Sequence, residues 1–226
     1  MKTTEKIALI LMVAFTLTTA IGCAPSAKMF RTGFLTDYSL LEEQSEGMVQ
    51  WVYIKDGVDF AAYDKIMIDR ITFFFKDDAA YKGIKPEELI ELAQYFYDAY
   101  WGTLIGAYTI TTKPGPRTLR VRTAITSLVP SKPVSGTLST VMPPALVASH
   151  IKKAATGVHI GMGQMSGEAE LIDSKTGEVL AMALDTETGK KYKLAKNFTK
   201  WGQAKEIAKE WVASFSKRLD KLSGRN

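Results

Sequence analysis

The chain has 226 residues, of which 46% are hydrophobic and 23% charged, a composition typical of a globular protein with a sizeable core. Its formal net charge of +5 is modest and no nucleic-acid-binding motif is recognisable, which disfavours a nucleic-acid partner. One cysteine excludes an internal disulfide, and two histidines without further cysteines cannot build a zinc site.

The first 22 residues have the pattern of a secretory signal. Lys2 and Lys6 precede an almost uncharged apolar stretch, 7–21, which is shorter than the roughly 20 residues that span a bilayer. Small residues then lead directly to Cys23, an order typical of a lipoprotein whose cysteine is acylated, with palmitate as one expected chain. We predict a signal peptide over 1–22 and lipid attachment at Cys23. An uncleaved membrane helix and a plain signal peptide are the alternatives.

The residue after the predicted lipid site bears on location. In enterobacterial-type sorting, an Asp at that position retains a lipoprotein in the inner membrane, and here the residue is Ala24. We therefore expect a lipid-anchored protein of the cell outer membrane that faces the periplasm.

Residues 23–48 are predicted to be a lipidated tether, and residues 49–226 a single globular domain. Within the tether, residues 33–41 are too apolar for a linker and are expected to dock on the domain. Strand-forming residues follow at 49–54, 65–69 and 71–75.

Two amphipathic helices are predicted. The first begins at Pro86 and ends near Gly106, with apolar residues at three- and four-residue spacing. The second covers 198–222. Core packing against a sheet is the simpler interpretation of the second helix, and a membrane-surface helix is the alternative.

Two arginines are the candidate ligand-binding residues. Residues 119–126 alternate, so that one face of the strand is apolar and the other carries Arg120 and Arg122. Such a pair could bind an anion or a glycan. A solvated face of an antiparallel sheet is the commoner arrangement.

The rest of the chain supplies a hairpin and an unusual insertion. Residues 128–149 contain four prolines and one charge, and suit either a partner- or membrane-contacting loop or an insertion folded on the domain. The glycines of 157–167 indicate a bulge or a close backbone approach, and residues 168–184 read as two strands joined by a polar turn.

Catalytic motifs are absent, with one decoy. Ser149 and Lys152 match S-x-x-K, and 175–177 matches K-T-G, as in penicillin-binding enzymes. The two motifs are too close together for that fold, and the second occupies a predicted turn.

Together these elements predict an α/β (α+β) fold, with a mixed, mostly antiparallel sheet of five to seven strands and two main helices packed on one face. They also carry a resemblance. The chain resembles the bacterial lipoproteins of the domain of unknown function 3313 family, through Cys23, 33–35 with 37–39, 63–69, 115–116 with 119–126, and 170–181. The resemblance implies an outer-membrane or periplasm-facing lipoprotein and supplies no catalytic residues.

The predicted function is a non-enzymatic binding or assembly factor of the cell envelope. It would be anchored to the membrane by its N-terminal lipid and bind envelope proteins or further copies of itself. A periplasm-facing hydrolase is one alternative, and a glycan or small-ligand module using Arg120 and Arg122 is another. No metal and no cofactor are expected.

Overall fold

The computed structural model describes residues 29, 31–44, 49–75, 84–129, 164–188 and 199–225, and residues 32–226 form one compact unit. The predicted signal peptide, Cys23, both histidines and most of the 128–149 insertion lie outside the described residues. The elements, in chain order, are η1 (Tyr38–Leu40), β1 (Glu42–Glu43), β2 (Trp51–Ile54), η2 (Phe60–Ala62), β3 (Lys65–Ile68), β4 (Thr72–Phe73), α2 (Pro86–Leu104), β5 (Thr109–Thr111), β6 (Thr118–Val129), β7 (Gln164–Asp173), β8 (Val179–Thr188) and α4 (Gly202–Leu222).

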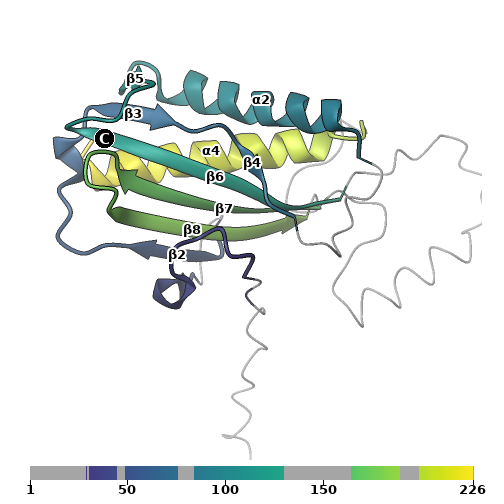
Figure 1. Ribbon diagram of the computed structural model, residues 1–226, viewed down its shortest axis with the longest axis horizontal. Coiled ribbons are helices and arrows are strands. Elements are labelled where there is room, and N and C mark those ends of the chain that lie inside the picture. Colours follow the sequence, from purple (N-terminus) through teal and green to yellow (C-terminus); the bar gives the residue numbers. More distant parts are fainter. Residues whose placement is uncertain are drawn as a thin grey trace, which may run out of the picture. The chain divides into compact units, whose positions relative to one another are not determined.

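The strands form one mixed sheet (Figure 1). Its order is β1-β2-β8-β7-β6-β3-β5, with β4 also paired to β6. The neighbouring pairs β1-β2, β2-β8, β8-β7 and β7-β6 are antiparallel. The pairs β6-β3, β3-β5 and β4-β6 are parallel. The expected fold class is confirmed. The sheet has eight strands rather than five to seven. The two-residue β1 is too short to leave a periodic signal, and β4 lies within the predicted stretch 71–75.

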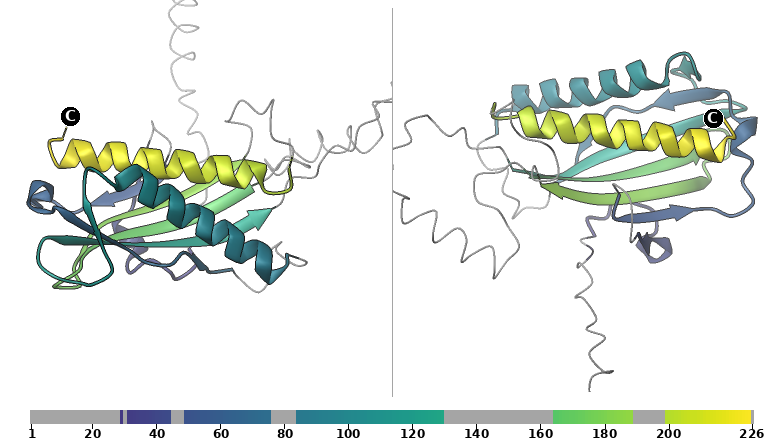
Figure 2. Two further views of the ribbon diagram at one scale, coloured as in Figure 1. Left: turned by 90° about the horizontal axis from the view of Figure 1, so that it is seen from above. Right: turned by 180° about the vertical axis from the view of Figure 1, so that it is seen from behind.

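Both helices cover the same face of the sheet (Figure 2). Pro86 occupies the first turn of α2, where its missing N–H costs nothing, and the Glu88 carboxylate accepts a 3.1 Å hydrogen bond from the Lys85 N–H. Gly106, with φ of +98°, follows the end of α2 in a conformation that favours glycine. The second helix starts at Gly202, four residues later than predicted.

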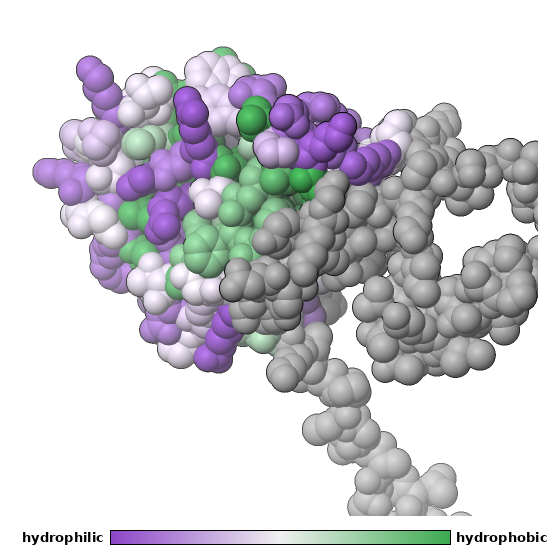
Figure 3. Space-filling model, turned by 45° about the vertical axis from the view of Figure 1, so that its right-hand side comes forward, coloured by the Kyte–Doolittle hydropathy of each residue, from purple (hydrophilic) through white to green (hydrophobic). Residues whose placement is uncertain are grey.

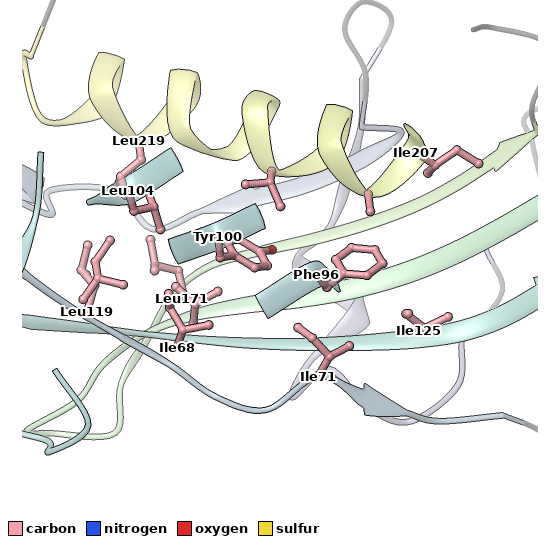
Figure 4. Close-up of a cluster of buried hydrophobic side chains, with 14 of the residues drawn as sticks. Ile68, Ile71, Phe96, Tyr100, Leu104, Leu119, Ile125, Leu171, Ile207 and Leu219 are labelled. Atoms are coloured by element: carbon pink, nitrogen blue, oxygen red, sulfur yellow. The ribbon is translucent and has the colours of Figure 1, made fainter. Parts of the chain in front are cut away.

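The main core lies between these helices and the sheet (Figure 4). Helix α2 contributes side chains at three- and four-residue spacing, and α4 contributes a second stripe. The residues that are almost fully shielded from solvent include Phe96, Leu104, Leu119, Ile125, Ile207 and Leu219. Burial on this scale is the dominant stabilising contribution to the fold.

Strand β6 shows how the sequence pattern becomes two faces. Leu119 and Val121 are buried toward the helices, and the Thr123 hydroxyl lies 3.2 Å from the Tyr100 hydroxyl on α2. Arg120 and Arg122 therefore point to the opposite face, as the alternation predicted.

Candidate functional site

Two carboxylates occupy the face of the sheet that the helices leave uncovered. Glu168 and Glu170 lie on β7, opposite Ala124 and Arg122 of β6 in the antiparallel register. Their exposed fractions are only 2% and 1%. Buried carboxylates require hydrogen-bond partners. The segment that covers Glu168 and Glu170 supplies these partners and forms the candidate site together with them.

That segment consists of residues 32–41, called the strap below. The Tyr38 hydroxyl accepts hydrogen bonds from the backbone N–H groups of Thr32, Gly33, Phe34 and Leu35, at 2.9 to 3.3 Å. It donates in turn to Glu168. One phenol thus closes the strap on itself and joins it to the sheet. Docking of this segment agrees with its apolar sequence.

Three further hydrogen bonds join the strap to the carboxylates. The Thr32 hydroxyl donates to Glu168 Oε1 at 2.9 Å. The backbone N–H and the hydroxyl of Thr36 both donate to Glu170 Oε1, at 2.6 and 2.7 Å. Since hydrogen bonds to an ionised group are the stronger kind, these contacts order the strap along β7.

The two carboxylates differ in charge compensation. Glu170 Oε2 accepts from Arg122 Nη1 at 2.6 Å, and the same guanidinium lies 5.0 Å from the centre of the Phe34 ring. Glu168 has no cation among the residues that the structure describes. Burial raises the pKa of Glu168, while its hydrogen bonds from Tyr38 and Thr32 oppose that shift.

The strap also leaves an aromatic surface beside the carboxylates. The Phe34 ring lies 6.1 Å from that of Phe74, a residue just after β4 that is 40% exposed. Figure 3 shows hydrophobic residues grouped on the face turned to the viewer, with hydrophilic residues to the left of and above them.

The two arginines predicted as ligand-binding residues are both engaged by carboxylates. Arg120 binds both oxygens of Asp69, at 2.7 to 3.0 Å, and Arg122 binds Glu170. An anion would have to compete with these partners. Binding of an anion or glycan by Arg120 and Arg122 stays a prediction.

Sequence reasoning did not identify Glu168, Glu170 or Tyr38. The two glutamates occur in the pattern Glu-Ala-Glu, which also describes any solvated strand face. Their burial depends on a strap more than 120 residues earlier in the chain. Only the apolar character of residues 33–41 hinted at that contact.

The described residues contain neither a metal-binding cluster nor a helix that could span a membrane. No group of three or more His, Cys, Asp and Glu side chains there could hold a metal ion. In that same part of the chain, no helix combines the length and the apolar character needed to cross a membrane. Lys175 and Thr176 lie in the turn between β7 and β8, as expected for a decoy, and Ser149 lies outside the described ranges.

The fold and the covered carboxylates define an α/β domain with an N-terminal strap on the face opposite its helices. The chain belongs to the family described as "Protein of unknown function (DUF3313)", whose model matches residues 31–215. The match includes the strap, β7 and most of α4. No curated protein matches the sequence.

Solved structures show distant similarity of fold. The PelC dodecamer from Paraburkholderia phytofirmans is 13% identical over 76% of this chain and 96% of its own, with a TM-score of 0.38. A PDZ domain protein from Parabacteroides distasonis is 15% identical over 74% of this chain but only 34% of its own, with a TM-score of 0.41. A putative neuraminyllactose-binding hemagglutinin homolog from Helicobacter pylori is 6% identical over 73% and 92%, with a TM-score of 0.39. These likenesses concern the fold alone.

Proposed function

We propose that this protein is a lipid-anchored envelope protein that acts by binding or assembly on the periplasmic side of the outer membrane. The observation that carries the proposal is the strap. A segment directly after the predicted lipid site is hydrogen-bonded to buried carboxylates in the centre of the sheet. The strap is therefore the mechanical link between a membrane anchor and the domain.

The length of the chain limits how far such an anchor can lie from the strap. Cys23 precedes Thr32 by nine residues. A fully extended chain spans about 3.5 Å per residue, so acyl chains on Cys23 would lie within about 30 Å of the strap. A short tether of this kind keeps the domain at the membrane surface and limits its reach to partners in the same layer of the envelope.

Membrane fractionation and the intact mass of the mature protein test the anchor. The native protein is expected in the membrane fraction with the mass of an acylated Cys23, and Cys23→Ala is expected to be released, since acyl chains contribute about 0.8 kcal/mol per buried methylene. Tyr38→Phe is the matched control, because it loosens the strap and leaves the lipid site intact. A Cys23→Ala protein that remains membrane-bound contradicts the anchor.

Photocrosslinking in the native envelope tests the binding role. Trp101 and Ile105, at the end of α2, are 40% and 55% exposed and are suitable positions for a photoreactive residue. We expect capture of a discrete envelope protein or of a second copy. The exposed Lys217 on α4 is the control position. Capture of the same proteins at all three positions would contradict a specific interface.

The hydrolase alternative keeps one supporting observation, the pair Glu168 and Glu170, of which Glu168 has a raised pKa. Against it, the strap and Arg122 hydrogen-bond to these carboxylates, and a substrate would have to displace those partners. Turnover of an envelope substrate that Glu168→Gln abolishes, without release of the protein from the membrane, would favour the enzyme over the proposed function.

A further inference from the structure

A second feature, on the helix-covered face, is independent of the strap. A pocket of about 110 Å³ lies between α4 and the strands β2, β7 and β8. In Figure 2, α4 runs along the sheet on this face. The pocket belongs to neither of the sites considered above, and most of the side chains that line it are apolar.

The pocket exists because the strands beneath α4 carry small residues. Ala169 on β7 lies opposite Ala183 on β8, and Ala181 continues the row, whereas the Trp211 ring takes the space over Gly167. Protein interiors are normally packed to the density of organic crystals, so a cluster of small residues under a helix leaves space that larger side chains would fill. The carboxylates of Glu168 and Glu170 lie on the other face, where they bind the strap. Their strand, β7, forms part of the floor of the pocket.

The wall of the pocket is one side of α4. Trp211, Phe215, Arg218 and Leu222 follow one another at three- and four-residue spacing and all line the pocket. At 1.5 Å rise per residue, this row extends for about 16 Å along the helix. The space is therefore elongated, with a shape that suits a linear chain.

The charged groups beside this row differ in sign and in how they are paired. At one end, the Trp211 indole N–H donates to Asp185 Oδ2 at 2.8 Å, and the Gln50 N–H donates to Asp185 Oδ1 at 3.1 Å, so this carboxylate is already satisfied. About 10 Å further along α4, the half-buried Arg218 makes no hydrogen bond or ion pair with any residue that the structure describes. An unpaired guanidinium beside an apolar space attracts an anionic group.

From this geometry we propose that the pocket binds the alkyl chain of a single-chain anionic lipid, with the negative group at Arg218 and the chain along α4 from Arg218 toward Trp211. The ligand is defined by one alkyl chain and one negatively charged group. A free fatty acid or a phospholipid could supply both. The inference does not require lipidation of Cys23.

Calorimetric titration of the Cys23→Ala chain, purified without detergent, tests this proposal. The probes are dodecanoate for a fatty acid, a lysophosphatidylglycerol with a twelve-carbon chain for a phospholipid, and dodecanol as the neutral match. All are used below their micelle-forming concentrations. We expect one site per chain for at least one anionic probe, with dodecanol at least about tenfold weaker, since hydrogen bonds to charged groups are the stronger kind.

Three variants locate the site. Arg218→Met is expected to weaken the anionic probe about tenfold or more and to leave dodecanol unchanged. Lys217→Met is the control, because Lys217 is an exposed neighbouring cation that does not line the pocket. Ala183→Leu is expected to fill the floor and abolish binding of every probe. If Ala183→Leu does not fold, the comparison of Arg218→Met with Lys217→Met decides the result.

Each outcome has one meaning. Binding of dodecanoate alone identifies a fatty acid, and binding of the lysolipid alone identifies a phospholipid. Absence of binding by both anionic probes overturns the proposal, as does dodecanol binding as tightly as they do. An equal loss of affinity for the anionic probe in Arg218→Met and Lys217→Met also overturns the proposal. None of these results bears on whether the protein is membrane-anchored, which fractionation decides separately.

Discussion

The two faces of the sheet are held in different ways. The helix-covered face is a continuous apolar core built from α2, α4 and the strands. The opposite face is covered by the strap, which adds buried Leu35 and Leu41 and hydrogen bonds to Glu168 and Glu170. Apolar burial is non-directional and tolerates small shifts, whereas a hydrogen-bonded strap depends on a few atoms in the correct positions.

This difference indicates what each face contributes. The core face supplies most of the stability of the domain, because it removes the largest apolar area from water. The strap face sets how the N-terminal segment leaves the domain. Removal of a single atom, the Tyr38 phenolic oxygen, is therefore expected to loosen the strap while the core remains folded.

Phe96→Ala is expected to destabilise the domain most. Phe96 is 1% exposed and lies in the main core, with its ring centre 6.3 Å from that of Trp211. Truncation of a buried Phe costs about 3–5 kcal/mol. Urea unfolding followed by circular dichroism measures this effect. A loss no larger than that of Tyr38→Phe would show that the two faces contribute equally.

Gly167→Ala is expected to cost about 1–3 kcal/mol through overpacking. A Cβ at Gly167 would lie 2.6 Å from Cζ3 of Trp211, so the indole and α4 would have to move. The control is Gly102→Ala on α2, where a Cβ meets nothing within 4 Å. That change is expected to stabilise the domain by about 0.5–1 kcal/mol, the ordinary preference for Ala in a helix. Thermal unfolding of both variants provides the comparison.

Tyr38→Phe is expected to release the strap at a cost of about 1–3 kcal/mol, because Glu168 and four backbone N–H groups lose one partner. Limited proteolysis should cut within 32–41 much faster than in the native protein, while the core stays resistant. Tyr97→Phe is the control, since the Tyr97 hydroxyl makes no hydrogen bond to any described residue. Unchanged cleavage within the strap would contradict its dependence on Tyr38.

Ionisation of a carboxylate is expected to affect stability in opposite directions on the two faces of the sheet. The folded-state pKa of Glu168 lies above its ordinary value of 4.5, so ionisation of Glu168 opposes folding. That penalty is fully present above the folded pKa and disappears as the pH falls through it toward 4.5. The stability advantage of Glu168→Gln over the native protein should therefore shrink as the pH is lowered from neutral.

Glu88, at the start of α2, provides the opposite case. A hydrogen bond from Lys200, together with one from the Lys85 N–H, lowers the pKa of Glu88 to about 2. Its stabilising contribution is present above pH 4.5 and is lost as the pH falls from there to about 2. Urea unfolding of Glu88→Gln and Glu168→Gln over a pH series measures both. A pH-independent difference for Glu168→Gln would contradict the raised pKa.

Much of the fold follows from local patterns. The alternation from Leu119 to Ile125 predicted which side of β6 faces the helices, and Pro86 with its spaced apolar residues predicted α2. The polar turn ending in Gly177, whose φ is +78°, predicted the hairpin of β7 and β8. These patterns work because strand and helix periodicities place apolar side chains on one face by geometry alone.

Local patterns in the chain were thus sufficient for the fold class, the two helices, the hairpin and membership of a family of unknown function. Three features are visible only in three dimensions: the burial of Glu168 and Glu170, the link from Tyr38 to Glu168, and the place of Arg218 beside an apolar pocket with no partner among the described residues. These features arise from residues far apart in the chain that meet across a sheet face. No local periodicity records such a meeting, because the same glutamate on a strand is solvated or buried according to what covers it.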